Sequence, residues 1–90
     1  MAGRNDVSLG EVTTYAMRHV AELSGREAVG VTAVERTEHG WRVCVEVVEL
    51  RRIPDTSDIL ALYETEVGGD GELVSFRRIR RYPRGRTEMG

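Results

Sequence analysis

The side chains of this 90-residue chain best suited to bind charged groups are arginines near its C-terminal end. Six of the eleven residues in FRRIRRYPRGR, residues 76–86, are arginine, although the formal net charge is only -2. Residues 1–75 carry seven arginines and fourteen acidic residues, whereas residues 76–90 carry six arginines and one acidic residue. Guanidinium groups pair with phosphates and with carboxylates. The segment therefore suits either a nucleic-acid-binding arm or the charged face of a β-strand.

Few other residues have the types and spacing that catalysis or metal binding requires. The two histidines, His19 and His39, and the single cysteine, Cys44, do not stand at zinc-ligand spacing. The glycine-rich stretch VGGDGE, residues 67–72, lacks the Lys-Ser/Thr pair and the following helix of a phosphate-binding loop. We therefore expect a protein that is not an enzyme and that needs no metal and no cofactor.

Length and composition indicate one small globular domain. The chain is 40% hydrophobic and 31% charged, which is too apolar for a disordered tail. No apolar run approaches the roughly 18 residues of a membrane span, and the start, MAGRNDVSLG, has no hydrophobic signal core. One cysteine excludes an internal disulfide, which fits a reducing compartment. We expect a cytoplasmic protein with no membrane partner.

Helical periodicity marks the first element. Ser8 is a suitable N-cap, and Glu11 three residues later completes a capping box. Gly25 is suited to a left-handed C-cap. These signals predict a helix over residues 9–24. Its apolar stripe consists of Leu9, Val12, Ala16, Val20 and Leu23.

After Gly30 the apolar pattern changes to a period of two, which is typical of strands. PDTSD, residues 54–58, is a connection whose aspartates suit Asx-type turns, and GGDG, residues 68–71, is a glycine-rich hairpin turn. The pattern predicts four strands, at residues 30–38, 41–52, 59–67 and 72–82.

One helix followed by four strands with short connections predicts an α+β fold of two layers. The N-terminal helix packs on one face of a four-stranded antiparallel meander sheet. We expect residues 8–83 to form this single domain. Residues 1–7 are predicted to be a flexible N-terminus, and residues 84–90 a flexible, arginine-containing C-terminal tail.

The last hairpin can be registered by placing Gly68 opposite Gly71, which puts Tyr63 opposite Phe76 on the helix-covered face. The other face then carries more apolar side chains than a solvated face should, and such an area usually marks a contact surface. A β-bulge or a register slip is the alternative explanation. The apolar residues predicted on this face are Val48, Leu50, Leu60, Leu62, Leu73 and Ile79, and Arg77 and Arg81 border them.

The same register divides the arginines into two groups. Arg77 lies diagonally from Glu64 and within reach of it, so part of the segment pairs with carboxylates of the domain. Arg84 and Arg86, beyond Pro83, have no such neighbour and are expected to be free for a partner.

The stretches GWRV, VVELRRIPDT and LALYE, together with the terminal FRRIRRY, resemble the gas vesicle protein GvpO family. The resemblance covers about residues 10–84. It implies an accessory role in gas vesicle formation in the cytoplasm, and it brings no catalytic motif.

These observations lead to one hypothesis and two alternatives. The hypothesis is that the apolar sheet face and the Arg77–Arg86 segment contact other gas vesicle proteins. One alternative is a nucleic-acid-binding regulator of vesicle gene expression or transcript stability, which acts through the arginine-rich strand and tail. The other is a homodimer built through the same apolar face.

Overall fold

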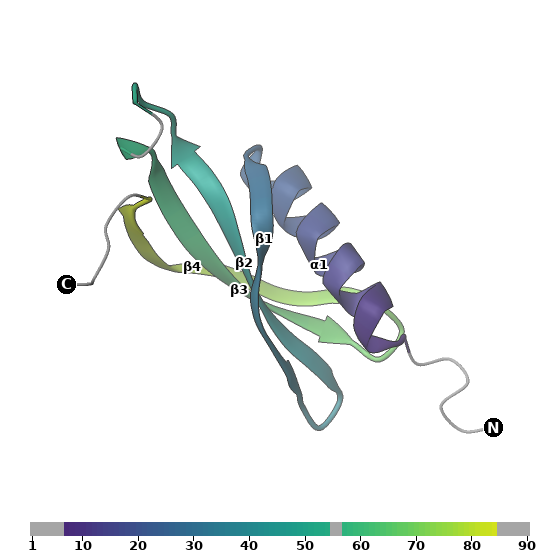
Figure 1. Ribbon diagram of the computed structural model, residues 1–90. Helices are drawn as coiled ribbons and strands as arrows, with labels where there is room; N and C mark the ends of the chain where they lie inside the picture. Colours follow the sequence, from purple (N-terminus) through teal and green to yellow (C-terminus); the bar gives the residue numbers. More distant parts are fainter. Residues whose placement is uncertain (1–6, 55–56, 85–90) are drawn as a thin grey trace.

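The computed structural model describes residues 7–54 and 57–84, which form one helix and four strands (Figure 1). The sheet order β1-β2-β3-β4 is that of an antiparallel meander, with β1 and β4 at the edges. The elements are α1 (Leu9–Ser24), β1 (Glu27–Arg36), β2 (Gly40–Leu50), β3 (Ile59–Gly68) and β4 (Leu73–Pro83).

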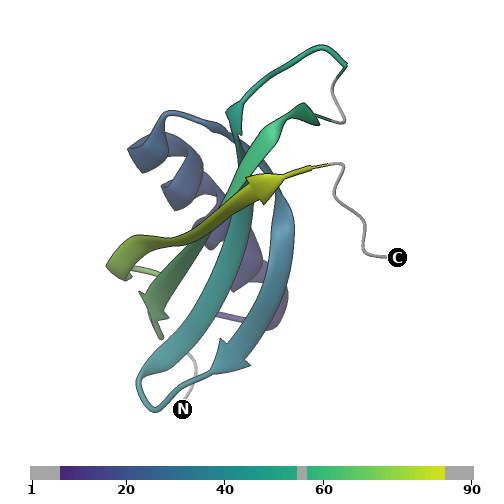
Figure 2. The ribbon, with the colours of Figure 1, turned by 90° about the vertical axis from the view of Figure 1, so that its left-hand side faces the viewer.

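Figures 1 and 2 show α1 lying across one face of a strongly twisted sheet, while the opposite face carries no helix. The predicted two-layer α+β fold is therefore confirmed. The main difference in bounds is at β1, which begins at Glu27, whereas its alternation predicts a start at Gly30. Residues 1–6 and 85–90, most of the predicted flexible ends, lie outside the described residues.

Helix α1 begins and ends at the predicted caps. The Ser8 hydroxyl accepts a hydrogen bond from the Glu11 backbone N–H at 3.2 Å, and the Ser8 N–H donates to the Glu11 carboxylate at 2.8 Å. At the other end Gly25 adopts φ 71° and donates to the Ala21 carbonyl at 2.9 Å. Residues at the two ends of α1 therefore fix its bounds, because both caps bond backbone groups that the helix itself leaves unpaired.

The core lies between α1 and the central strands. Burying a valine side chain contributes about 1.5–3 kcal/mol, so valines supply much of the stability. Leu9 and Leu23, the ends of the predicted stripe, are instead more than half exposed. The core residues are all at most 1% exposed: Val12, Ala16, Val20, Val43, Val45, Val47, Ala61 and Val67.

The register of β4 differs from the predicted one. Tyr63 lies opposite Arg78, not Phe76, because the Gly68 N–H bonds the Glu72 carbonyl, one residue beyond the predicted Gly71, and because β4 has a register irregularity at Val74. A second irregularity of β4 lies at Ile79. Each adds an unpaired residue to the strand, as a β-bulge does. The Tyr63 and Phe76 rings still stack, with centroids 4.9 Å apart.

The strand register places three of the predicted contact residues on the helix-covered side. Leu73 lies opposite the core residue Val67, and Arg81 lies opposite the core residue Ala61. A further irregularity in β2 pairs Leu50 with Ile59, the strand neighbour of Leu60. Because neighbouring residues of a strand point to opposite faces, Leu50 and Leu60 do not share a face. The predicted placement of all three residues on the uncovered face is wrong.

Candidate binding face of the sheet

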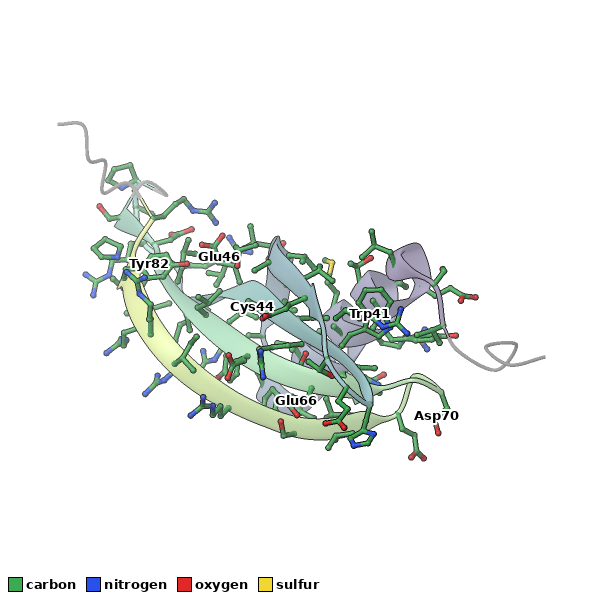
Figure 3. All side chains as sticks on the ribbon, turned by 90° about the horizontal axis from the view of Figure 1, so that it is seen from below. Trp41, Cys44, Glu46, Glu66, Asp70 and Tyr82 are labelled. Carbon is green, nitrogen blue, oxygen red and sulfur yellow. The ribbon has the colours of Figure 1, made fainter. Side chains whose placement is uncertain are left out.

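The sheet face that α1 does not cover is called the open face here. Opposite residues of an antiparallel pair share a face, and the register therefore places Glu46 and Leu62 together, with Arg80 beyond Leu62. Figure 3 shows Tyr82 and Glu46 toward one end of the sheet and Glu66 and Asp70 toward the other. The open face carries Arg42, Cys44, Glu46 and Val48 from β2, Leu60, Leu62, Glu64 and Glu66 from β3, and Ser75, Arg77, Arg80 and Tyr82 from β4.

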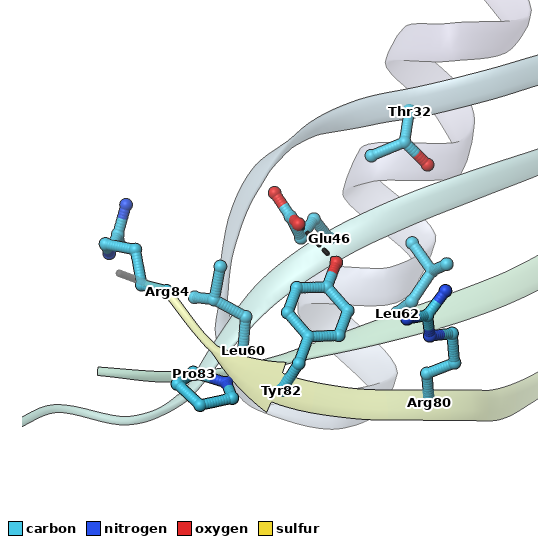
Figure 4. Close-up of a pocket in the computed structure, with 8 residues that line it drawn as sticks. All are labelled: Thr32, Glu46, Leu60, Leu62, Arg80, Tyr82, Pro83 and Arg84. Carbon is cyan, nitrogen blue, oxygen red and sulfur yellow. Dashed lines mark hydrogen bonds between the residues drawn. The ribbon is translucent and has the colours of Figure 1, made fainter. Parts of the chain in front are cut away.

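A groove of about 750 Å³ lies at one end of the open face (Figure 4). Leu60, which is 4% exposed, and the half-buried Leu62 lie at its floor. Polar and charged groups surround these leucines. The lining residues are Thr32, Glu46, Leu60, Leu62, Arg80, Tyr82, Pro83 and Arg84. A mixed apolar and charged lining is what a binding site for another molecule needs.

Tyr82 spans the groove beside Leu60. Its hydroxyl donates a hydrogen bond to the Glu46 carboxylate, so that the ring extends from β4 past β3 to β2 (Figure 4). Burial, and then the hydrogen bond to Glu46, raises the pKa of Tyr82 to about 12. The hydroxyl therefore stays protonated, and remains a donor, at neutral pH.

The other end of the open face carries a ladder of opposite charges. Arg42 lies 2.9 Å from a Glu35 oxygen and 3.4 Å from a Glu66 oxygen. Arg77 lies 2.8 Å from Glu64, directly opposite it in the register, which confirms the predicted contact between them. Cys44 lies among these groups, and burial, followed by the nearby Glu64 charge, raises the pKa of its thiol. A thiol with a raised pKa is a poor nucleophile at neutral pH.

Two arginines of β4 pair with one carboxylate on the helix-covered side. The Glu49 side chain, 15% exposed, lies 2.7 Å from the Arg78 guanidinium and 3.2 Å from that of Arg81. Glu49 is itself the extra residue where the β2 register shifts. These two arginines are therefore occupied within the domain.

Arg84 is also anchored, contrary to the expectation that it is free. Its backbone N–H donates to the Asp58 carbonyl at 2.7 Å, and its Nε lies 3.5 Å from Asp58 Oδ2. Asp58 is only 1% exposed, and its Oδ1 accepts from the Arg52 backbone N–H at 2.7 Å. Sequence reasoning missed this buried carboxylate. The available signal was its position directly before the apolar run ILAL.

Arg80 has a different environment from its neighbours. Its guanidinium lies over the Tyr82 ring, 5.3 Å from the centroid, which is a cation–π distance. Within residues 7–54 and 57–84, no ion pair joins Arg80 to a carboxylate. Arg86 lies outside the described residues.

The remaining predicted contact residues divide into two groups. Val48, 7% exposed, lies opposite Leu60 on the open face, so the structure brings it together with the groove floor. Ile79, the extra residue of β4, is 39% exposed and does not line the groove.

Over the residues that the structure describes, no group of three or more His, Cys, Asp or Glu side chains is placed to hold a metal ion. Nor does that part of the chain contain a helix long and apolar enough to cross a membrane. The fold and the groove together define a small two-layer α+β domain with a grooved, helix-free sheet face.

The family of this domain follows from comparison with known proteins. The family described as "Gas vesicle synthesis protein GvpO" matches residues 2–88, and the chain belongs to that family. It is 53% identical to Gas vesicle protein O of Streptomyces sp. (strain CB03234) over 81% of this chain. It is 35% identical to Gas vesicle protein O1 of Halobacterium salinarum over 90% of this chain, and 32% identical to Gas vesicle protein O of Haloferax mediterranei over 88%.

The chain spans only part of these relatives. The matched region is 57% of the Streptomyces protein, 68% of the Halobacterium protein and 57% of the Haloferax protein. No solved structure matches the chain significantly.

Proposed function

We propose that this chain acts in gas vesicle synthesis as a non-enzymatic accessory protein, through contacts with other gas vesicle proteins. Membership of the gas vesicle synthesis family supports the process. The proposed mode of action rests on the groove of the open face, where polar side chains surround Leu60 and Leu62. Leu60 is almost fully covered, so the apolar surface offered to a partner comes from the half-buried Leu62 and the Tyr82 ring.

The expected contact surface is smaller than the sequence pattern suggests. It consists of the groove together with Val48, and its charged members are Glu46, Arg80 and Arg84. Leu50, Leu73 and Arg81 are not part of it, because the strand register places them on the other side. Ile79 and Arg77 flank it on β4.

Binding of nucleic acid by the arginine-rich strand is less well supported. Arg77, Arg78 and Arg81 each have a carboxylate within 3.2 Å, and a phosphate would have to compete with it. Binding through phosphates weakens with salt, at a log–log slope of roughly −0.7 to −0.9 per phosphate contacted. A gel shift with vesicle-operon RNA at two salt concentrations measures this alternative directly.

Co-purification from vesicle-forming cells tests the proposal. A tagged Leu62→Ser chain should lose the gas vesicle proteins that the unchanged chain retains. Leu23→Ser is the matched control, because Leu23 is 57% exposed on α1 and lies far from the groove. Equal recovery of vesicle proteins with both variants contradicts the proposed mode of action. Light scattering on the unchanged chain detects the homodimer that the same face can form.

A further inference from the structure

The charges of the described residues differ between the two ends of the sheet. Both hairpins lie at one end, where the register pairs Gly40 with Gly68. The described residues 7–12, 33–44 and 63–77 at this end hold three arginines and seven carboxylates, a net charge of −4. The other end, residues 24–30, 46–54, 57–62 and 78–84, holds seven arginines and four carboxylates, a net charge of +3.

The groove lies at the basic end, and its two walls differ (Figure 4). Arg80 and Arg84 of the β4 side form one wall, and Thr32 of β1 belongs to the other. Glu46 is the one carboxylate of the lining, and it already accepts the Tyr82 hydroxyl. Arg80 has no carboxylate partner among the described residues, and Arg84, which faces Asp58 at 3.5 Å, keeps 35% of its side chain exposed. A partner with carboxylates along the β4 wall would complement both cations.

The dimensions of the face favour a helix as the occupant. Four strands at a spacing of about 4.8 Å leave about 14 Å between β1 and β4, and a helix with its side chains is about 10–12 Å wide. A partner strand would pair poorly with either edge of the sheet. The edge strands β1 and β4 each have two register irregularities, which interrupt the row of backbone groups that such a strand would bind. The face itself, rather than an edge, is therefore the available surface.

We propose that the groove binds an acidic amphipathic helix of a partner protein. Apolar side chains of that helix pack on Leu62 and the Tyr82 ring, and carboxylates on one flank pair with Arg80 and Arg84. Four residues of extended chain span about 13 Å, so the carboxylates should stand about eight or nine residues apart at 1.5 Å per residue of helix. This inference rests on the proposed function, because it names the partner class for the same face.

Two synthetic peptides test this inference with the full chain. Both are 18-residue helices with a leucine face, one flanked by glutamates and the other by lysines at the same positions. Fluorescence anisotropy at low ionic strength should show the glutamate peptide binding about tenfold more tightly than the lysine peptide. Arg80→Glu should remove this preference. Arg77→Glu, at the acidic end of the same strand, should keep it, and circular dichroism verifies that both variants fold.

Equal binding of the two peptides, or equal loss with Arg80→Glu and Arg77→Glu, overturns the inference. A dimer that dissociates on Leu62→Ser also overturns it, since a second copy would then occupy the groove. The proposed function is judged separately, by whether Leu62→Ser abolishes co-purification of vesicle proteins. Loss of co-purification without any peptide preference leaves that function standing and removes only the acidic helix.

Discussion

The hydroxyl of Tyr82, near the end of β4, donates a hydrogen bond to the carboxylate of Glu46 on β2. The two strands are not adjacent, because β3 lies between them. The ring therefore lies beside Leu60, which is 4% exposed although it is on the helix-free face. One aromatic residue of the edge strand thus both shapes the groove and fastens that strand to the sheet.

Tyr82→Phe should lower the free energy of unfolding by about 1 kcal/mol, the usual contribution of a hydrogen bond. Chemical denaturation at neutral pH measures this loss. Tyr63→Phe is the matched control, since the half-buried Tyr63 stacks on Phe76 and its hydroxyl has no hydrogen bond within the described residues. A loss as large for Tyr63→Phe would mean that the bond to Glu46 contributes nothing.

The same tyrosine predicts a pH dependence at high pH. Its folded pKa is raised from 10.0 to about 12, so the folded state holds the proton more tightly than the unfolded state does. The contribution is complete below pH 10 and is lost as the pH rises through about 12. The stability difference between the unchanged chain and Tyr82→Phe should shrink over this interval. A constant difference from pH 8 to pH 12 is inconsistent with the raised pKa.

Asp58→Ala should destabilise the domain by about 2 kcal/mol, because the buried carboxylate accepts the Arg52 N–H and faces Arg84. Thermal or urea unfolding measures the change. Ser57→Ala, at the exposed neighbouring position, should change stability by less than about 0.5 kcal/mol. Similar values for both variants would show that the Asp58 contacts with Arg52 and Arg84 contribute nothing to stability.

Gly40→Ala should lower the free energy of unfolding by about 2–3 kcal/mol, because the added Cβ would clash with the Val67 carbonyl oxygen on the neighbouring strand. The backbone of one hairpin must shift to relieve this clash. Gly30→Ala, where no heavy atom lies within 4 Å of the added Cβ, provides the comparison in the same sheet. It should leave the urea midpoint nearly unchanged. A stable Gly40→Ala protein would contradict the close approach of β2 and β3.

Val45→Ala should lower the free energy of unfolding by about 2–3 kcal/mol, since the Val45 side chain is fully buried in the core under α1. Val74→Ala removes the same two methyl groups from a position that is 66% exposed, and should cost under about 0.5 kcal/mol. Urea unfolding of the two variants compares them. Equal costs would place the core on the wrong face of the sheet.

The helix and the strand order could be predicted because their signals are local. Ser8, Glu11 and Gly25 satisfy backbone groups within a few residues of themselves, so the sequence pattern is sufficient. Strand number follows in the same way from alternation and turn residues. The family resemblance was likewise carried by short stretches, and it is confirmed by the family match over residues 2–88.

The composition of the open face could be predicted only in part, because it depends on distant packing. Each of the irregularities at Glu49, Val74 and Ile79 changes which face of the sheet the following side chains point to. No residue type near them predicts such an irregularity. Together with the shifted register of the last hairpin, they explain why Leu50 and Leu73 lie on the helix-covered side of the sheet, whereas Leu60 and Leu62 lie on the open face as predicted. The pairing of the buried Asp58 with Arg84, 26 positions later, could likewise not be predicted from local patterns, although the apolar run after Asp58 hinted at its burial.

Site-specific photocrosslinking in vesicle-forming cells tests the central proposal most directly. A photoreactive amino acid placed at position 62, in the groove, or at position 23, on the exposed side of α1, reports which face meets a partner. We expect position 62 to crosslink to a gas vesicle protein identified by mass spectrometry and position 23 not to do so. Crosslinks to vesicle proteins from position 23 alone would contradict it.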